Sequence, residues 1–171
     1  MRRRWLLLLD LDGTLWDHPD VTSMEPPFER LGPLSLRDSR GVELHVYPYM
    51  ARLALWARRS HGIVASFTWN VPWKALEALR TLGLDGLFDY HLAEPHPRKD
   101  LVLRRFLSSL RCERGYAPSP GEIVYIDDRD IHIGQIRETV GDVHFIRSHR
   151  DCRSYEECRS LIEGLLGLRG S

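Results

Sequence analysis

The chain has 171 residues, 24 basic and 24 acidic side chains, 43% hydrophobic residues and a formal net charge of zero. This length predicts one domain over residues 1–171 that buries roughly two-thirds of its unfolded surface. Because the charges are balanced and spread along the chain, the composition excludes a general nucleic-acid binder with a basic stripe. It also excludes a polybasic membrane anchor.

Targeting and redox features are few. The apolar run Trp5–Leu9 follows three arginines but meets Asp10 too soon to be a secretory signal. No other apolar stretch approaches the roughly 20 residues of a membrane span. The cysteines Cys112, Cys152 and Cys158 are odd in number and lack C-x-x-C spacing, which supports neither a disulfide framework nor a zinc ribbon. We therefore expect a cytoplasmic protein in a reducing compartment, without nucleic-acid or membrane partners.

Apolar runs of strand length alternate with helical patterns along the chain, which is typical of βαβ units around a parallel sheet. We predict strands at residues 5–9, 62–65, 88–92, 122–126 and 143–146. We predict helices at residues 50–61, 72–82, 98–113, 131–140 and 154–168. The predicted fold class is α/β, a Rossmann-like doubly wound parallel sheet with helices on both faces.

The stretch 16–49 interrupts this alternation, because it is rich in proline and polar residues and too long for an ordinary βα loop. Within it, residues 34–37 and 42–46 alternate with period two around the turn Asp38-Ser-Arg-Gly41. This pattern predicts a small β-hairpin flap inserted after the first strand, with no large cap domain.

Polar and charged side chains suited to catalysis or ligand binding follow several of the predicted strands. In an open parallel sheet, ligands bind at the carboxyl ends of the strands, so these groups should meet at one edge. Carboxylates with one lysine suit Mg²⁺ and a phosphoryl group together, since hard oxygen ligands hold the ion and the ammonium offsets phosphoryl charge. The residues concerned are Asp10, Asp12, Thr14, Ser66, Lys99, Asp127 and Asp128.

In this order the groups resemble the motifs of the haloacid dehalogenase superfamily of aspartyl-phosphate enzymes, whose first motif, D-x-D-x-T, stands here as Asp10-Leu-Asp-Gly-Thr14. Within that superfamily the chain is most similar to the magnesium-dependent phosphatase family. The shared segments are Asp12-Gly-Thr-Leu-Trp16, Pro26-Pro-Phe28, Asp38-Ser-Arg-Gly41, Tyr47-Pro48 and Ala65-Ser66 with Thr68. The resemblance implies a Mg²⁺-dependent phosphomonoester hydrolase.

The resemblance also implies roles for the acidic residues. Asp10 would be the nucleophile that becomes phosphorylated and a Mg²⁺ ligand. Asp12 would be the general acid and then the general base, with its backbone carbonyl on the metal. Asp128 would bind Mg²⁺ directly and Asp127 through water, while Thr14 would brace the loop.

For the substrate phosphate, the resemblance implies Ser66 and Lys99 as the groups that hold the phosphoryl oxygens. Phe67, next to Ser66, is assigned to the same phosphate-binding set, at a position where these relatives tend to carry a basic side chain. Lys99 is one of only two lysines, and the other, Lys74, is predicted on the exposed face of its helix. The substrate would be a phosphorylated small molecule, such as a phosphosugar, or a phosphoprotein carrying phosphotyrosine.

Two other functions stay open for the same aspartate. A phosphotransferase would have to keep water from the aspartyl-phosphate, and such exclusion usually requires a lid domain that a hairpin does not supply. A phospho-acceptor signalling module of the receiver type carries its lysine after the hydroxyl, at the last strand. Here the lysine is not the last of these groups, because the chain order is carboxylates, hydroxyl, lysine and then a second pair of carboxylates. This order favours an enzyme.

Overall fold

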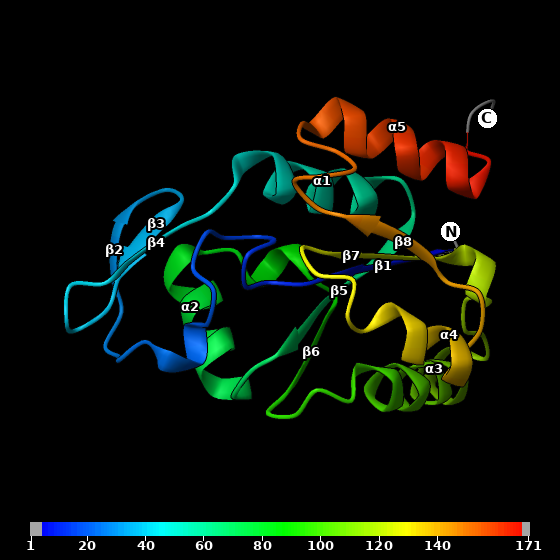
Figure 1. Ribbon diagram of the computed structural model, residues 1–171, viewed down its shortest axis with the longest axis horizontal. Coiled ribbons are helices and arrows are strands. Elements are labelled where there is room, and N and C mark those ends of the chain that lie inside the picture. The colour runs from blue at the N-terminus through cyan, green and yellow to red at the C-terminus, as the bar shows by residue number, and fades with distance from the viewer. Residues whose placement is uncertain (1–4, 169–171) are drawn as a thin grey trace.

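The computed structural model describes residues 5–168 and has a five-stranded parallel sheet at its centre (Figure 1). The strands lie in the order β6-β5-β1-β7-β8, and every neighbouring pair is parallel. The predicted α/β fold is therefore confirmed. The strand bounds are β1 Trp5–Leu9, β5 Gly62–Trp69, β6 Tyr90–Glu94, β7 Ile123–Asp127 and β8 His144–Arg147.

Helices cover both faces of this sheet, with α1 and α5 on one side and α3 and α4 on the other (Figure 1). The α-helices are α1 Pro48–Arg59, α2 Pro72–Leu82, α3 Lys99–Arg114, α4 Ile133–Thr139 and α5 Tyr155–Leu166. Short 3-10 helices are η1 Val21–Ser23, η2 Asp85–Leu87 and η3 Pro120–Glu122. Among residues 5–168, no helix has the length and apolar character needed to cross a membrane.

Strand β1 lies in the middle of the sheet, and this position explains why polar and apolar residues do not alternate in its sequence. Trp5, Leu7 and Leu9 pack into the core on the side of α1, α2 and α5. Leu6 and Leu8 pack into the core on the side of α3 and α4. Because successive side chains of a strand point to opposite faces, a strand with two covered faces is apolar throughout.

The insertion after β1 forms a separate antiparallel sheet of three strands, seen at the left of Figure 1. Its strands are β2 Glu29–Gly32, β3 Ser35–Arg37 and β4 Glu43–His45. The predicted hairpin corresponds to β3 and β4, whose residues Leu36 and Leu44 are buried in the core. The sequence prediction missed β2, because its Glu-Arg-Leu-Gly segment has no buried face to give a period of two.

Lys74 of α2 ties the beginning of the insertion to the main body. Its Nζ donates to the backbone carbonyls of Thr22 at 2.7 Å and Met24 at 2.9 Å. The prediction that Lys74 lies on the exposed face of its helix is wrong, because the residue is half-buried and its ammonium is hydrogen-bonded. Its charge satisfies two carbonyl oxygens next to η1, which holds this part of the insertion against α2.

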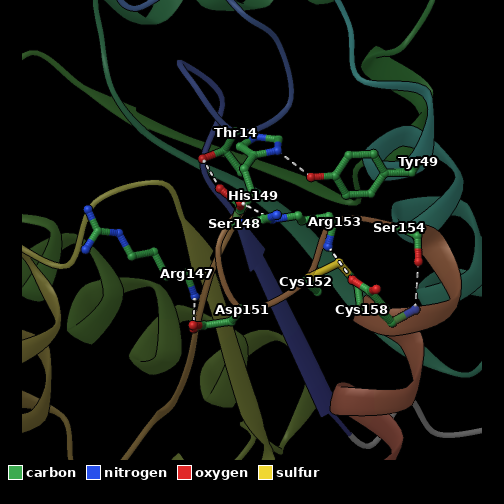
Figure 2. The surroundings of a disulfide bond; sticks show 11 residues. Thr14, Tyr49, Arg147, Ser148, His149, Asp151, Cys152, Arg153, Ser154 and Cys158 are labelled. Carbon is green, nitrogen blue, oxygen red and sulfur yellow. Dashed lines mark hydrogen bonds between the residues drawn. A yellow bond between two sulfur atoms is a disulfide. The ribbon is translucent and has the colours of Figure 1, made fainter.

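Cys152 and Cys158 form a disulfide bond, so the expectation of no disulfide is wrong (Figure 2). Cys152 lies in the turn after β8, where its backbone pairs with that of Ser148 in an isolated β-bridge. Cys158 lies in α5. The turn reverses the chain and brings together two sulfurs whose spacing of six matches no familiar motif. Cys112 is free and exposed. The inference of a reducing compartment, which rested on the cysteine pattern, loses that support.

Candidate active site

The nucleophile candidate Asp10 follows β1 directly and meets Lys99, the first residue of α3. Lys99 Nζ donates to Asp10 Oδ1 and Asp127 Oδ2, both at 2.9 Å, and to the Tyr125 hydroxyl at 3.2 Å. Only 5% of Asp10 and 3% of Lys99 is exposed. Burial opposes the charged ammonium, but the carboxylates of Asp10 and Asp127 outweigh it and raise the pKa of Lys99. Lys99 is therefore a fixed cation beside Asp10.

Asp10, Asp127 and Asp128 form a cluster of carboxylates, with one oxygen from each lying within 4.8 Å of the others. Gly13, at φ 71°, allows this approach, because a Cβ there would lie 2.6 Å from Asp128 Oδ2. Burial raises the pKa of Asp10 to about 8, even though the charge of Lys99 opposes the rise. Three carboxyl groups share the single ammonium of Lys99, so the ionisation of all three calls for a further cation. This donor set fits Mg²⁺, a hard cation that prefers carboxylate oxygens.

Thr14 holds the loop that follows β1 against the segment that follows β7. Its hydroxyl accepts a hydrogen bond from the backbone N–H of Asp128 at 2.9 Å and lies 3.2 Å from Asp10 Oδ2. The same hydroxyl lies 3.2 Å from Ser148 Oγ, in the turn that carries the disulfide (Figure 2). Thr14 thus connects the loop after β1 with the segments after β7 and β8.

Asp12 lies two residues beyond Asp10 and is held by three donors. Its Oδ1 accepts from Trp16 Nε1 at 2.8 Å and from the backbone N–H of Val21 at 3.0 Å. Its Oδ2 accepts from Asn70 Nδ2 at 2.7 Å. Burial raises the pKa of the Asp12 carboxyl, and these hydrogen bonds oppose the rise. The three donors fix the orientation of the carboxylate, which is not one of the three clustered carboxylates.

A cavity of about 360 Å³ opens above these groups, at the carboxyl ends of the strands. The loop that follows β1, the end of β5 and the inserted segment all contribute to its walls. The lining residues are Asp10, Asp12, Pro19, Asp20, Thr22, Thr68, Trp69, Asn70, Val71, Pro95 and Arg129. Asp10 and Asp12 therefore both face a space large enough for a small organic group.

The predicted phosphate-binding segment lies at β5, where the structure brings a different hydroxyl to the cavity. Ser66 does not line the cavity, and its Oγ is hydrogen-bonded with His91 Nδ1 at 3.0 Å. Phe67 is 1% exposed and packs edge-on against Tyr125 with ring centroids 5.4 Å apart. Thr68 lines the cavity instead, and its Oγ1 accepts a hydrogen bond from Asn70 Nδ2 at 2.6 Å.

Sequence reasoning missed Thr68 and Asn70 as parts of the site, and it did not assign Trp16 to Asp12. One signal was available, because Asn70 is the only asparagine in the chain and follows the predicted strand and its hydroxyl. Trp16 gives no such signal, since tryptophan is ordinarily a core residue. Its indole N–H needs a partner when buried, and Asp12 supplies it.

No protein-family model and no curated protein matches the sequence. Solved structures do match. The N-terminal part of a Bacteroides fragilis protein, which contains a phosphatase domain complexed with Mg, has a TM-score of 0.59 at 17% identity. That match covers 99% of this chain and 42% of the other, so the chain spans less than half of that structure.

Two further structures are similar over most of both chains. A haloacid dehalogenase-like hydrolase from Streptococcus pneumoniae has a TM-score of 0.55 at 18% identity and covers 85% of this chain and 84% of its own. The cobalt-bound deoxy-D-mannose-octulosonate 8-phosphate phosphatase of Haemophilus influenzae has a TM-score of 0.53 at 14% identity, with 96% and 90% covered. The chain has the haloacid dehalogenase-like fold.

Proposed function

We propose that the protein is a Mg²⁺-dependent phosphomonoester hydrolase that forms an aspartyl-phosphate on Asp10. One observation carries the proposal: Asp10, held by Lys99, and Asp12, held by three donors, line the same cavity beside a cluster of carboxylates. A nucleophile, a proton donor and a place for a cation are the parts that this chemistry needs. The similar structures named as phosphatases, one with Mg and one with cobalt, support the same reading.

In the first step, a carboxylate oxygen of Asp10 attacks phosphorus and the bond from phosphorus to the ester oxygen breaks. The departing oxygen takes the proton of the Asp12 carboxyl, so the leaving group departs as a neutral alcohol or phenol. Lys99 offsets charge on the transferring phosphoryl group from its fixed position beside Asp10. We propose the hydroxyl of Thr68 as the donor to a phosphoryl oxygen, in place of Ser66.

In the second step, the ionised Asp12 takes a proton from water and the water oxygen attacks phosphorus. The bond between phosphorus and Asp10 breaks, which releases inorganic phosphate and restores both carboxyl groups to their starting states. Trp16 and Asn70 keep the Asp12 carboxylate in one orientation through both transfers. One acid thus serves in both directions.

Asp10, Asp127 and Asp128 would hold the Mg²⁺ ion. When bound, the ion would reduce the electrostatic repulsion between the Asp10 carboxylate and a phosphate dianion. The substrate in this proposal is a phosphomonoester, from a small molecule or a phosphoprotein, whose alcohol or phenol enters the cavity next to Asp12.

Phosphate release from 4-nitrophenyl phosphate tests this function. We expect turnover with Mg²⁺ and none after exhaustive chelation. Asp10→Asn should abolish turnover because an amide is a poor nucleophile. Asp12→Asn should lose most with substrates whose alcohols leave poorly, since these depend on the proton. Asp142→Asn, at a side chain that is 98% exposed, is the matched control.

The alternatives give different results in the same assay. A signalling module would take up one phosphoryl group per chain, free one equivalent of 4-nitrophenol, and show no steady release of phosphate. A phosphotransferase would pass the phosphoryl group to an added alcohol in preference to water. Activity that survives chelation would contradict the metal assignment, and near-native activity of Asp10→Asn would contradict the covalent mechanism.

A further inference from the structure

The cavity extends beyond the reacting groups to two side chains that the proposed mechanism leaves unused, Trp69 and Arg129. Trp69 ends β5 and Arg129 follows β7, and these strands flank β1, which delivers Asp10. The two side chains therefore enter the cavity from either side of the nucleophile. They lie where the part of a substrate beyond the phosphoryl group would lie.

Trp69 presents an aromatic surface to this space. It is 43% exposed, which is unusual for a large apolar side chain next to a buried site. Its ring forms a T-shaped pair with His132, with centroids 6.4 Å apart and planes at 82°. A half-exposed indole at the cavity offers a flat apolar wall against which another ring can stack.

Arg129 is exposed, and within residues 5–168 its guanidinium has no hydrogen-bond or ion-pair partner. It is also the only cationic side chain among the described residues that line the cavity. Lys99 does not share this role, because its ammonium is committed to Asp10 and Asp127. An unpaired guanidinium next to a substrate space is suited to bind an anionic group through paired N–H donors.

One carboxylate at the rim of the cavity, that of Asp20, carries a charge that opposes the binding of an anionic group. Asp20 also lines the cavity, but its carboxylate oxygen Oδ1 accepts the backbone N–H of Thr22 at 3.0 Å, as the cap of η1. Asp10 and Asp12 belong to the reacting end. The charge of Arg129 is also felt by Asp128, whose raised pKa it opposes, but no described residue forms a hydrogen bond or ion pair with the guanidinium.

We propose that Trp69 and Arg129 form a leaving-group subsite that takes a planar leaving group carrying its own negative charge. The proposal rests on the proposed function and names its substrate class: phosphomonoesters whose alcohol or phenol part has a flat ring and an anionic substituent. The ring stacks on Trp69, and the anionic substituent pairs with Arg129 while the ester phosphate lies between Asp10 and Asp12.

Two substrates that differ in one charge test the role of Arg129: phenyl phosphate and 4-carboxyphenyl phosphate. We expect Arg129→Gln to lower kcat/KM about 10-fold or more for the carboxylated substrate, mostly through KM, and less than about 2-fold for phenyl phosphate. Arg111→Gln, an exposed arginine outside this cavity, should change neither. Comparing each variant with the wild type on each substrate cancels the difference in leaving ability between the two phenols.

The possible outcomes are distinct. Equal loss on both substrates would place Arg129 on the phosphoryl group and overturn the subsite, and no loss on either would overturn it as well. If the wild type hydrolyses neither substrate with Mg²⁺, the proposed function fails first. Wild-type turnover without a charge-dependent loss in Arg129→Gln defeats only this inference.

The aromatic wall has its own test. Trp69→Leu should raise KM for phenyl phosphate several-fold and leave glycerol 2-phosphate, which has no ring, almost unchanged. Trp73 is 56% exposed and does not line the cavity, so Trp73→Leu is the matched control. Equal changes on the two substrates in Trp69→Leu would show that the indole does not contact the leaving group.

Discussion

The ammonium of Lys99 lies 2.9 Å from Oδ1 of Asp10, although 89 positions separate the two residues in the sequence. The same Nζ also lies 5.1 Å from the ring centroid of Phe67 and 5.3 Å from that of Tyr125. The site is therefore shaped around a compact point charge between carboxylates and aromatic faces. A guanidinium fork is wider and directs its donors differently.

We expect Lys99→Arg to lower kcat/KM for an aryl phosphate about 100-fold, a size typical of losing one preorganised charge contact. Phosphate release and melting temperature should be measured together, because a buried exchange can also affect folding. The matched control is Arg111→Lys, the reverse exchange at an exposed position. Near-native activity in Lys99→Arg would remove the ammonium from the catalytic apparatus.

The two hydroxyls of β5 give opposite expectations. Thr68→Val keeps the shape of the side chain but removes the hydroxyl at the cavity, so we expect kcat/KM to fall about 100-fold. Thr68→Ser should restore most of the activity. Ser66→Ala should change activity little and cost about 1 kcal/mol of stability, because it loses the hydrogen bond with His91. If Ser66→Ala proves the inactive variant, Ser66 is the phosphate ligand after all.

The fold was predictable because its central strands are apolar on both faces. Trp5–Leu9 has the same bounds in sequence and structure, since both cores demand apolar residues there. Strand β5 was predicted to end at Ala65 but continues to Trp69, because its polar residues still pair with β6. That extension moves the edge of the sheet along the chain, so the hydroxyl at the cavity is Thr68 and not Ser66.

The acidic groups and the lysine of the site were predictable as a set, because parallel strands end at a common edge. Asp10, Asp127 and Lys99 do meet there. The partners of Asp12 were not predictable, since Trp16 reaches it from within the same loop and Asn70 from beyond β5. Such contacts depend on the path of loops, which residue patterns do not record.

The disulfide should contribute to stability. Linking Cys152 to Cys158 closes a short loop, and the chain-entropy relation gives about 2 kcal/mol for a loop of this size. We therefore expect a reductant, or the double variant Cys152→Ser/Cys158→Ser, to lower the free energy of unfolding by that amount in urea titrations. Cys112→Ser should have no effect, because that thiol is free and exposed. Mass spectrometry without reductant checks that the bond forms, and an unchanged unfolding midpoint on reduction would contradict its contribution.

Asp100 should make stability depend on pH. Its carboxylate accepts two hydrogen bonds from Arg98, both at 2.9 Å, and one from Thr139 at 2.8 Å. The bonds from Arg98 hold the pKa of Asp100 far below its ordinary value.

Because the pKa of Asp100 is lower in the folded state than in the unfolded state, its contribution is complete above the unfolded value of about 4 and declines as the pH falls below it. Asp100→Asn should therefore lower the free energy of unfolding by about 1–3 kcal/mol at pH 7, since an amide replaces a charged acceptor. The difference in the free energy of unfolding between variant and wild type should fall to roughly half or less between pH 4 and pH 2. Urea titrations at pH 7 and pH 3, with the exposed Asp142→Asn as control, measure it. A difference that is the same at both pH values would mean that Asp100 acts through packing and not through its charge.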